Sequence, residues 1–212
     1  MTNVLKWNLE YIAIHRLADS VLASAGIEKL DDTEIFVEHP EYESYYISQY
    51  GRAISLKRNT VKLLGAFMGG QPDRRYWYYG FAANGNSHTI SMNRAVADVF
   101  CPNFWGNAKR LEAHHINGNK LDNDYRNLIL LTPKLHGAIH NIKKIILLKD
   151  GMIKEYPNPL DLVYDTGLTL EDILLANKSK KKPLKSEGKY TIFEIKGHLI
   201  GFQYYPKAQK NK

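Results

Sequence analysis

The sequence predicts an α+β protein in which small antiparallel β modules and short helices accompany a β-β-α unit. Residues 9–21 space their apolar side chains as a helix does, and residues 35–100 hold short aromatic and β-branched runs broken by glycine. Between residues 111 and 142, two strand-like runs precede residues that typically start a helix. At 212 residues the chain is long enough for more than one folded unit.

Composition narrows the class of protein. The single cysteine, Cys101, excludes a disulfide framework and a cysteine-based zinc cluster within one chain. No apolar run reaches the length of a membrane-spanning helix, and the N-terminus lacks the apolar core of a signal peptide. We expect a cytoplasmic protein with no membrane partner, and the oligomeric state stays open.

The basic charge is concentrated near the C-terminus. Residues 178–212 contain ten lysines and two glutamates, a net charge of +8, whereas the whole chain carries +7. A basic segment favours a polyanionic partner such as DNA, although many mildly basic proteins bind no nucleic acid.

The N-terminal half predicts a helix and then strands. Residues 8–25 are expected to form one amphipathic helix, with Asn8 as its cap and Gly26 as its stop. Residues 35–64 predict short strands, and Tyr76 to Phe81 predict a strand that enters a hairpin turn, so a small antiparallel sheet is expected.

A short helix is predicted between this sheet and the β-β-α unit. Ser91 is its expected cap and Pro102 its expected stop. Its buried face has the i, i+3, i+4, i+7 spacing of Met92, Ala95, Val96 and Val99.

The β-β-α unit holds four of the chain's eight histidines. A strand ends at His114-His115, a loop rich in Asn, Asp and Gly follows, and Leu128 to Leu131 form a second strand. Thr132 and Pro133 are typical cap and first-turn residues of a helix. The expected core stripe of that helix is Leu135, Ile139 and Ile142.

The histidine spacing predicts a catalytic metal site. His136 and His140 are i, i+4 neighbours, so both imidazoles can reach one ion. His114 or His115 can supply a third nitrogen, which leaves positions open for water and a phosphate oxygen. Adjacent strand residues point to opposite sides, so one histidine of the pair is expected on the metal and the other to take a proton from water.

Two simpler interpretations compete with this one. Single histidines on a helix or in a strand are usually surface or core residues without a ligand, and a loop Asn usually only makes a turn. A structural zinc site would use four ligands in a closed tetrahedron and has no use for an additional His115 or Asn127.

At these residues the chain resembles the HNH endonuclease family, whose ββα-metal fold carries a histidine pair, a central Asn and a helical His. The matching text is HHINGNK at 114–120, Asn127-Leu128, TPKLH at 132–136, and His140. The resemblance implies that His114, His136 and His140 are metal ligands. It further implies that His115 is the general base and Asn127 a brace across the loop that orients it. Asn117 stands where many homing-type relatives have Asp.

Residues 35–100 resemble the small modular DNA-binding domain that accompanies HNH homing endonucleases of phages and mobile introns. The resemblance rests on YYISQYGRAIS at 45–55 and SMNRAVADVF at 91–100. Candidate contacts to phosphates or bases in this module are Arg52, Lys57, Arg58, Arg74 and Arg75, although exposed basic residues are usually only solvated.

Residues 1–34 and 141–212 resemble no family that we can name. Residues 141–150 fit either a longer helix or a strand pair. Residues 170–177 predict a helix with a Thr169/Asp172 capping box, residues 178–185 a lysine-rich linker, and residues 190–205 a hairpin around Lys196-Gly197. The expected organisation is a helical segment at 1–34, a DNA-binding module at 35–100, an HNH unit at 101–145 and an extension at 146–212.

The function expected from the sequence is hydrolysis of double-stranded DNA by a homing-type HNH endonuclease with one divalent ion. Mg²⁺ or Mn²⁺ is the expected working ion, and imidazole ligands would bind Zn²⁺ or Ni²⁺ more tightly. The resemblance implies products with 3′-hydroxyl and 5′-phosphate ends. The alternative is a non-catalytic DNA- or RNA-binding protein that keeps the ββα unit as a zinc-stabilised scaffold.

Overall fold

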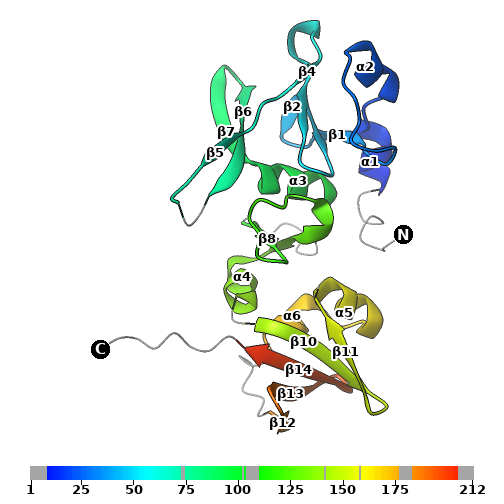
Figure 1. Ribbon diagram of the computed structural model, residues 1–212, viewed down its shortest axis with the longest axis vertical. Helices are drawn as coiled ribbons and strands as arrows, with labels where there is room; N and C mark the ends of the chain where they lie inside the picture. Colours follow the sequence, from blue (N-terminus) through cyan, green and yellow to red (C-terminus); the bar gives the residue numbers. More distant parts are fainter. Residues whose placement is uncertain are drawn as a thin grey trace. The chain divides into compact units, whose positions relative to one another are not determined.

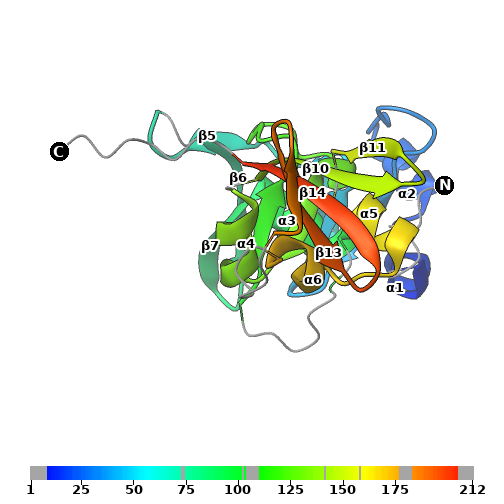
Figure 2. The same cartoon turned by 90° about the horizontal axis from the view of Figure 1, so that it is seen from below.

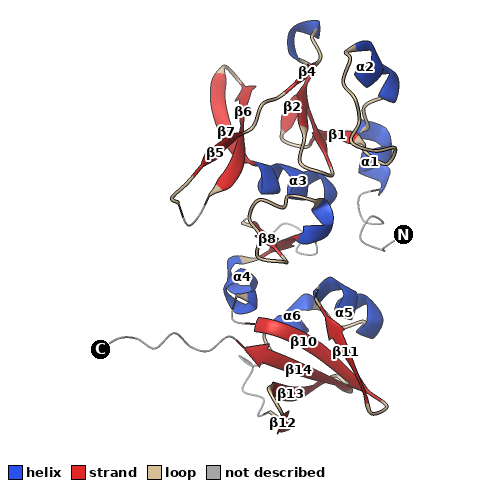
Figure 3. Ribbon diagram, in the orientation of Figure 1, coloured by secondary structure: helices blue, strands red, loops and turns tan. Residues whose placement is uncertain are grey.

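The structure is a computed structural model, and it describes residues 9–72, 75–101, 103, 110–140, 142–157, 159–176 and 183–204. It confirms the α+β class, because several small antiparallel sheets alternate with short helices (Figures 1 and 3). The chain divides into two compact units, residues 1–130 and 131–212, and the division falls inside strand β9. Within the described residues, no helix has both the length and the apolar character needed to cross a membrane.

The N-terminal segment forms two short helices, so the prediction of one helix over residues 8–25 is wrong. They are α1 (Leu9–His15) and α2 (Asp19–Ser24). The break occurs because Arg16 pairs with Val37 in a β-bridge and the Leu17 N–H donates to the Phe36 carbonyl at 2.7 Å. These bonds to a neighbouring strand take the place of helical ones. The predicted helix stop at Gly26 is confirmed, because Gly26 has a left-handed φ of 66° just after α2. The expected cap, Asn8, lies outside the described residues.

The first unit contains two antiparallel sheets, as the alternating and glycine-broken runs indicate. The four-stranded sheet has the order β1-β2-β3-β4, and the three-stranded sheet has the order β5-β6-β7. Their strands are β1 (Phe36–His39), β2 (Tyr42–Ser48), β3 (Ala53–Ser55), β4 (Lys62–Leu63), β5 (Phe67–Gly69), β6 (Tyr76–Ala83) and β7 (Asn86–Ser91), and a 3-10 turn η2 (Lys57–Asn59) precedes β4. The predicted hairpin turn is present at Asn84-Gly85, where both residues have positive φ as a tight two-residue hairpin requires.

Helix α3 (Met92–Phe100) joins the sheets to the histidine-bearing segment. Its N-cap Ser91 is extended as expected, although its hydroxyl makes no capping bond, and the helix ends at Phe100, two residues before the expected stop. Ala95, Val96 and Val99 are fully buried in a core shared with Ile47 and Phe81 from the two sheets. The expected stop, Pro102, lies outside the described residues.

The two predicted strands of the β-β-α unit pair with each other. They are β8 (Glu112–His115) and β9 (Leu128–Leu131), and a 3-10 turn η3 (Tyr125–Asn127) leads directly into β9. The Ile116 N–H donates to the Asn127 carbonyl at 2.8 Å, which continues the pairing beyond β8. Leu128 and Leu130 belong to the same core as α3, so this core sets the position of β8 and its histidine pair.

Helix α4 (Pro133–Ile139) begins at the predicted Thr132-Pro133 start. His140 is its C-cap residue, and Ile142 already belongs to the next strand, so the prediction that Ile142 continues the helical stripe is wrong. Leu135 and Ile139 are buried as expected.

The second unit contains a five-stranded antiparallel sheet, which decides the ambiguous segment after His140 in favour of strands. The order is β11-β10-β14-β13-β12, so the C-terminal β14 lies between β10 and β13 (Figure 2). Its strands are β10 (Ile142–Lys149), β11 (Met152–Tyr156), β12 (Lys185–Glu187), β13 (Tyr190–Ile195) and β14 (His198–Tyr204). The predicted hairpin is confirmed, with positive φ at both Lys196 and Gly197.

Two helices accompany this sheet. Helix α5 (Pro159–Thr166) was not predicted, and α6 (Leu170–Leu174) has the predicted Thr169/Asp172 capping box but ends before residue 177. Of the lysine-rich linker predicted at 178–185, residues 178–182 lie outside the described residues. At its end the prediction is wrong, because Lys185 pairs with Ile192 and begins β12. The expected boundary at residue 145 falls inside β10, because Ile145 pairs with Phe202 of β14.

Candidate metal and nuclease site

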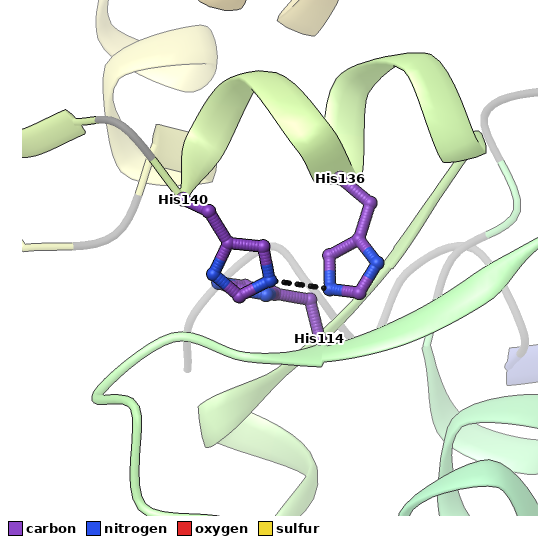
Figure 4. Close-up of side chains that lie close together, drawn as sticks. All are labelled: His114, His136 and His140. Atoms are coloured by element: carbon purple, nitrogen blue, oxygen red, sulfur yellow. Dashed lines mark hydrogen bonds between the residues drawn. The ribbon is translucent and has the colours of Figure 1, made fainter. Parts of the chain in front are cut away.

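Three histidines bring their ring nitrogens together. One nitrogen each from His114, His136 and His140 lies within 4.8 Å of the other two, and Figure 4 shows the three imidazoles turned toward one another. His114 comes from β8, whereas His136 and His140 come from α4 and its C-cap. These are the three residues that the family resemblance implies as ligands.

The helical pair has the closest spacing. The Nε2 atoms of His136 and His140 are 3.1 Å apart, because one helical turn separates the two residues (Figure 4). His140 is exposed, whereas His114 and His136 are partly covered. The cluster is therefore open to water on the side of His140.

The donor set fits a small divalent ion. Neutral imidazoles bind such ions through bonds of about 2.1 Å, and tetrahedral angles then separate the ligand nitrogens by roughly 3.4 Å. The 3.1 Å between the Nε2 atoms of His136 and His140 is close to that separation. Three nitrogens leave part of the coordination shell for water or substrate oxygen.

His115 faces different surroundings from its neighbour His114. It is 5% exposed, its ring lies 6.1 Å from that of Tyr76 between centroids, and its Nε2 is 3.1 Å from Oδ1 of Asn123. Burial lowers the pKa of His115 below its usual value, and this outweighs the opposite effects of the Asn123 hydrogen bond and of Asp122. The imidazole is thus neutral at pH 7, as a general base must be.

Asn127 braces the loop, and its amide bonds to groups other than His115. Its Oδ1 accepts from the Asn117 N–H at 2.9 Å, and its Nδ2 donates to the Asp122 carbonyl at 2.9 Å. These two bonds tie the start of the loop to its end. Asn127 thus spans the loop, and the role of orienting the base, which the resemblance implies for it, stays a prediction.

Asn123 is the residue that sequence reasoning missed. It is 5% exposed, and it occupies the position in the loop from which an amide reaches the His115 ring. The loop contains several Asn and Asp residues that make local turns, such as Asn119 and Asp124, so nothing in the sequence separates Asn123 from them. Its burial could have been found only from the tertiary structure.

Two of the five candidate DNA contacts are engaged within the protein. Arg52 donates to the buried carboxylate of Glu34 at 2.9 Å and to the Glu28 carbonyl at 2.9 Å. Lys57 donates to the Ala82 carbonyl and lies 4.8 Å from the centre of the Tyr45 ring. Both side chains therefore stabilise the module, and DNA would have to compete for them.

The other candidates differ in exposure. Arg58 is exposed on the η2 turn with a φ of 57°, and Arg75 is exposed just before β6, where its guanidinium is 3.9 Å from the Met68 sulfur. Arg74 lies outside the described residues. Arg58 and Arg75 are thus the better placed of the described candidates for contacts to a polyanion.

Comparison with solved structures finds a similar nuclease structure. The chain is similar to the HNH homing endonuclease I-HmuI, in a structure titled for DNA binding and cleavage by that enzyme. The sequences are 22% identical, the match covers 81% of this chain and 99% of that one, and the TM-score is 0.40. No model of a known protein family and no curated protein matches the chain.

Proposed function

We propose that this chain is a metal-dependent DNA endonuclease of the HNH type. The observation that carries the proposal is that two consecutive histidines of β8 have different partners. The nitrogen of His114 lies with those of His136 and His140, while the next residue, His115, is buried, neutral and hydrogen-bonded elsewhere. A metal-assisted hydrolase needs both a ligand set and a separate base, and consecutive strand residues supply them on opposite sides.

His114, His136 and His140 would hold one divalent ion, with Mg²⁺ or Mn²⁺ proposed as the working ion. When bound, the ion supplies positive charge beside the phosphodiester that is cleaved. Because three imidazoles also suit Zn²⁺ and Ni²⁺, affinity alone does not identify the ion used.

His115 would take the proton from the attacking water. Because His114 and His115 are consecutive in β8, the base would directly follow a metal ligand in the chain. Asn127 would hold the loop closed through its bonds to Asn117 and Asp122. Hydrolysis in this arrangement is proposed to leave 3′-hydroxyl and 5′-phosphate ends.

Double-stranded DNA is the proposed substrate, and the homing type of site-specific cleavage is the proposed mode. The lysine-rich C-terminal sequence supplies sequence-independent attraction, and the first unit supplies the exposed Arg58 and Arg75. Contacts to phosphates would position the DNA, whereas base contacts from the module would specify the site.

A non-catalytic protein with a zinc scaffold is the competing proposal. A closed structural zinc site has four protein ligands, whereas the ligand group found among the described residues has three. The neutral, buried His115 beside this group also has no function in a scaffold. Both observations favour the enzyme.

A nicking assay tests the proposal. Purified full-length protein is incubated with supercoiled and phage-derived DNA in Mg²⁺ or Mn²⁺, with and without EDTA. Cleavage that requires the ion and is lost in His136→Ala and in His115→Ala supports the endonuclease. DNA binding without cleavage under every ion tested would favour the scaffold.

A further inference from the structure

The amide of Asn123 has one orientation that satisfies its surroundings. Its Nδ2 donates to the Leu121 carbonyl at 3.3 Å and approaches the Met92 sulfur at 3.3 Å. Rotating the amide by 180° would place Oδ1 against the Leu121 oxygen, and two acceptors would then face each other. Oδ1 must therefore face His115.

This orientation determines where the proton of neutral His115 resides. Oδ1 of an amide only accepts, so the Nε2 atom 3.1 Å away must donate to it. A neutral imidazole has one N–H, and a proton on Nε2 leaves the lone pair on Nδ1. The contact thus selects one tautomer as well as one ring orientation.

Asn123 also lies against the module at residues 35–100, at the turn that contains Gly51. The turn between β2 and β3 passes close by, and a Cβ at Gly51 would lie 3.3 Å from the Cβ of Asn123 and 2.8 Å from the Met92 sulfur. The Gly51 carbonyl accepts from the buried Tyr79 hydroxyl at 2.5 Å, and the Gln49 carbonyl accepts from the Tyr125 N–H at 2.9 Å. These bonds join the turn to the β6 strand and to the loop that carries Asn123.

We infer that Asn123 is the positioning residue of the nuclease site, and that it makes Nδ1 of His115 the atom that accepts the proton of the attacking water. The inference rests on the proposed function, in which His115 is the base. It assigns to Asn123 the direct contact with the base, and it leaves to Asn127 the bracing of the loop ends. It also makes the base depend on the module, because the Gly51 turn supports Asn123.

Two measurements on the full-length protein test the inference. The first is the long-range ¹⁵N–¹H spectrum of histidine-labelled protein at pH 8, in which His115→Gln identifies the His115 signals. The second is the single-turnover rate of cleavage at saturating DNA for wild type, Asn123→Leu and Asn123→Asp. Asn119→Leu is the matched control, since Asn119 makes a turn in the same loop without touching His115.

We expect wild-type His115 to carry its proton on Nε2. Asn123→Leu, which keeps the branching at Cγ but has no acceptor, should cleave about 10- to 100-fold more slowly, a part of what a general base contributes. Its DNA dissociation constant and metal affinity should match those of the wild type, and Asn119→Leu should keep the wild-type rate. Asn123→Asp retains an acceptor for Nε2–H but places its second oxygen against the Leu121 carbonyl, so it should recover only part of the rate.

Three results would overturn the inference. A proton on Nδ1 in the wild type would contradict the tautomer whatever the variants do, and does not depend on how well they fold. A wild-type rate in folded Asn123→Leu would remove the positioning role while leaving the endonuclease intact. Absence of ion-dependent cleavage by the wild type would overturn the proposed function and the inference together.

Discussion

His114 and His115 are consecutive in the chain, yet their side chains have separate partners. The His114 nitrogen lies within 4.8 Å of those of His136 and His140, whereas His115 is 5% exposed with its Nε2 3.1 Å from Asn123. The alternation of side chains along a β-strand produces this separation. Because the two residues have separate partners, substitutions of the metal group and of the base should have different consequences.

Replacing His115 by Ala should abolish cleavage without releasing metal or DNA. The base acts only in the chemical step, and its loss should slow single-turnover cleavage by about 10²- to 10⁴-fold. Calorimetry with Mn²⁺ and a DNA-binding titration should give wild-type affinities. The matched control is His88→Ala on β7, which should cleave normally, and wild-type cleavage by His115→Ala would refute the assignment.

Replacing His136 by Ala should lose metal affinity and activity together. His136 is one of three ligand nitrogens, and metal-binding energy contributes to the stability of the folded site. Calorimetry with Zn²⁺ should show weaker binding, and the thermal midpoint should stop rising when metal is added. His140→Ala should weaken binding less, because His140 is the exposed C-cap residue of α4. Unchanged affinity in His136→Ala would exclude it as a ligand.

Replacing Gly51 by Ala should destabilise the first unit by about 1 to 3 kcal/mol. Gly51 has a φ of 91°, and an added Cβ would meet the Met92 sulfur at 2.8 Å. Urea unfolding measures the change. Gly65→Ala provides the control, because φ is not positive there and a Cβ at that position meets nothing within 4 Å. Equal midpoints for the two variants would show that the Gly51 turn is not tightly packed.

Cys101 should be unreactive in the folded protein. The residue is 2% exposed, and burial raises the pKa of its thiol far above the usual range, so it stays protonated. Alkylation by iodoacetamide at pH 8 should be roughly a hundredfold slower in the native than in the urea-unfolded protein, since it requires opening of the structure. Rapid labelling of the native protein would show that solvent reaches the core at Cys101, the C-cap residue of α3.

The same thiol makes stability depend on alkaline pH. In the unfolded chain it ionises near pH 8.5, whereas in the folded protein it remains protonated. Its contribution is therefore complete below about pH 8.5 and is lost as the pH rises, at up to about 1.4 kcal/mol per pH unit. Urea unfolding from pH 8 to 10 should show a smaller decline in Cys101→Ala than in the wild type.

Neutralising Lys178, Lys180, Lys181 and Lys182 should weaken the salt dependence of DNA binding. Each phosphate neutralised on duplex DNA contributes about 0.9 to the slope of log affinity against log salt, so replacing the four by Gln should flatten it by about 3 to 4 units. The Lys→Arg version keeps the charge and should keep the slope. Equal slopes for the Gln and wild-type proteins would remove this segment from DNA binding, and the cleavage position should not change.

Point substitutions are preferable to a truncation at this end of the protein. The strand β14 lies between β10 and β13, so removing residues after 177 would take away the centre of the five-stranded sheet. The basic sequence is thus partly a structural component of the second unit, so charge substitutions at residues 178–182 test its role while keeping β14 in the chain.

Local sequence was sufficient wherever a residue's role depends on its near neighbours. The Thr169/Asp172 capping box, the Pro133 start of α4, the tight turn at Asn84-Gly85 and the i, i+4 relation of His136 and His140 all form within a few residues. Their energetics depend on backbone geometry that the sequence specifies directly. The helical pair of the ligand set could be predicted for the same reason, whereas the choice of His114 over His115 came from the resemblance to the HNH family.

Tertiary structure decided what local patterns leave open. Arg16 ends α1 because Val37, 21 residues later in the sequence, offers a strand partner, and residues 142–149 became a strand because β14 pairs with them. Asn123 was selected from several equivalent loop residues because the Gly51 turn and Met92 bury it against His115. Such choices depend on contacts between distant parts of the chain, whose energies no local propensity contains. The sequence by itself determined the ligand spacing and the order of the β-β-α segment, and packing decided which amide holds the base.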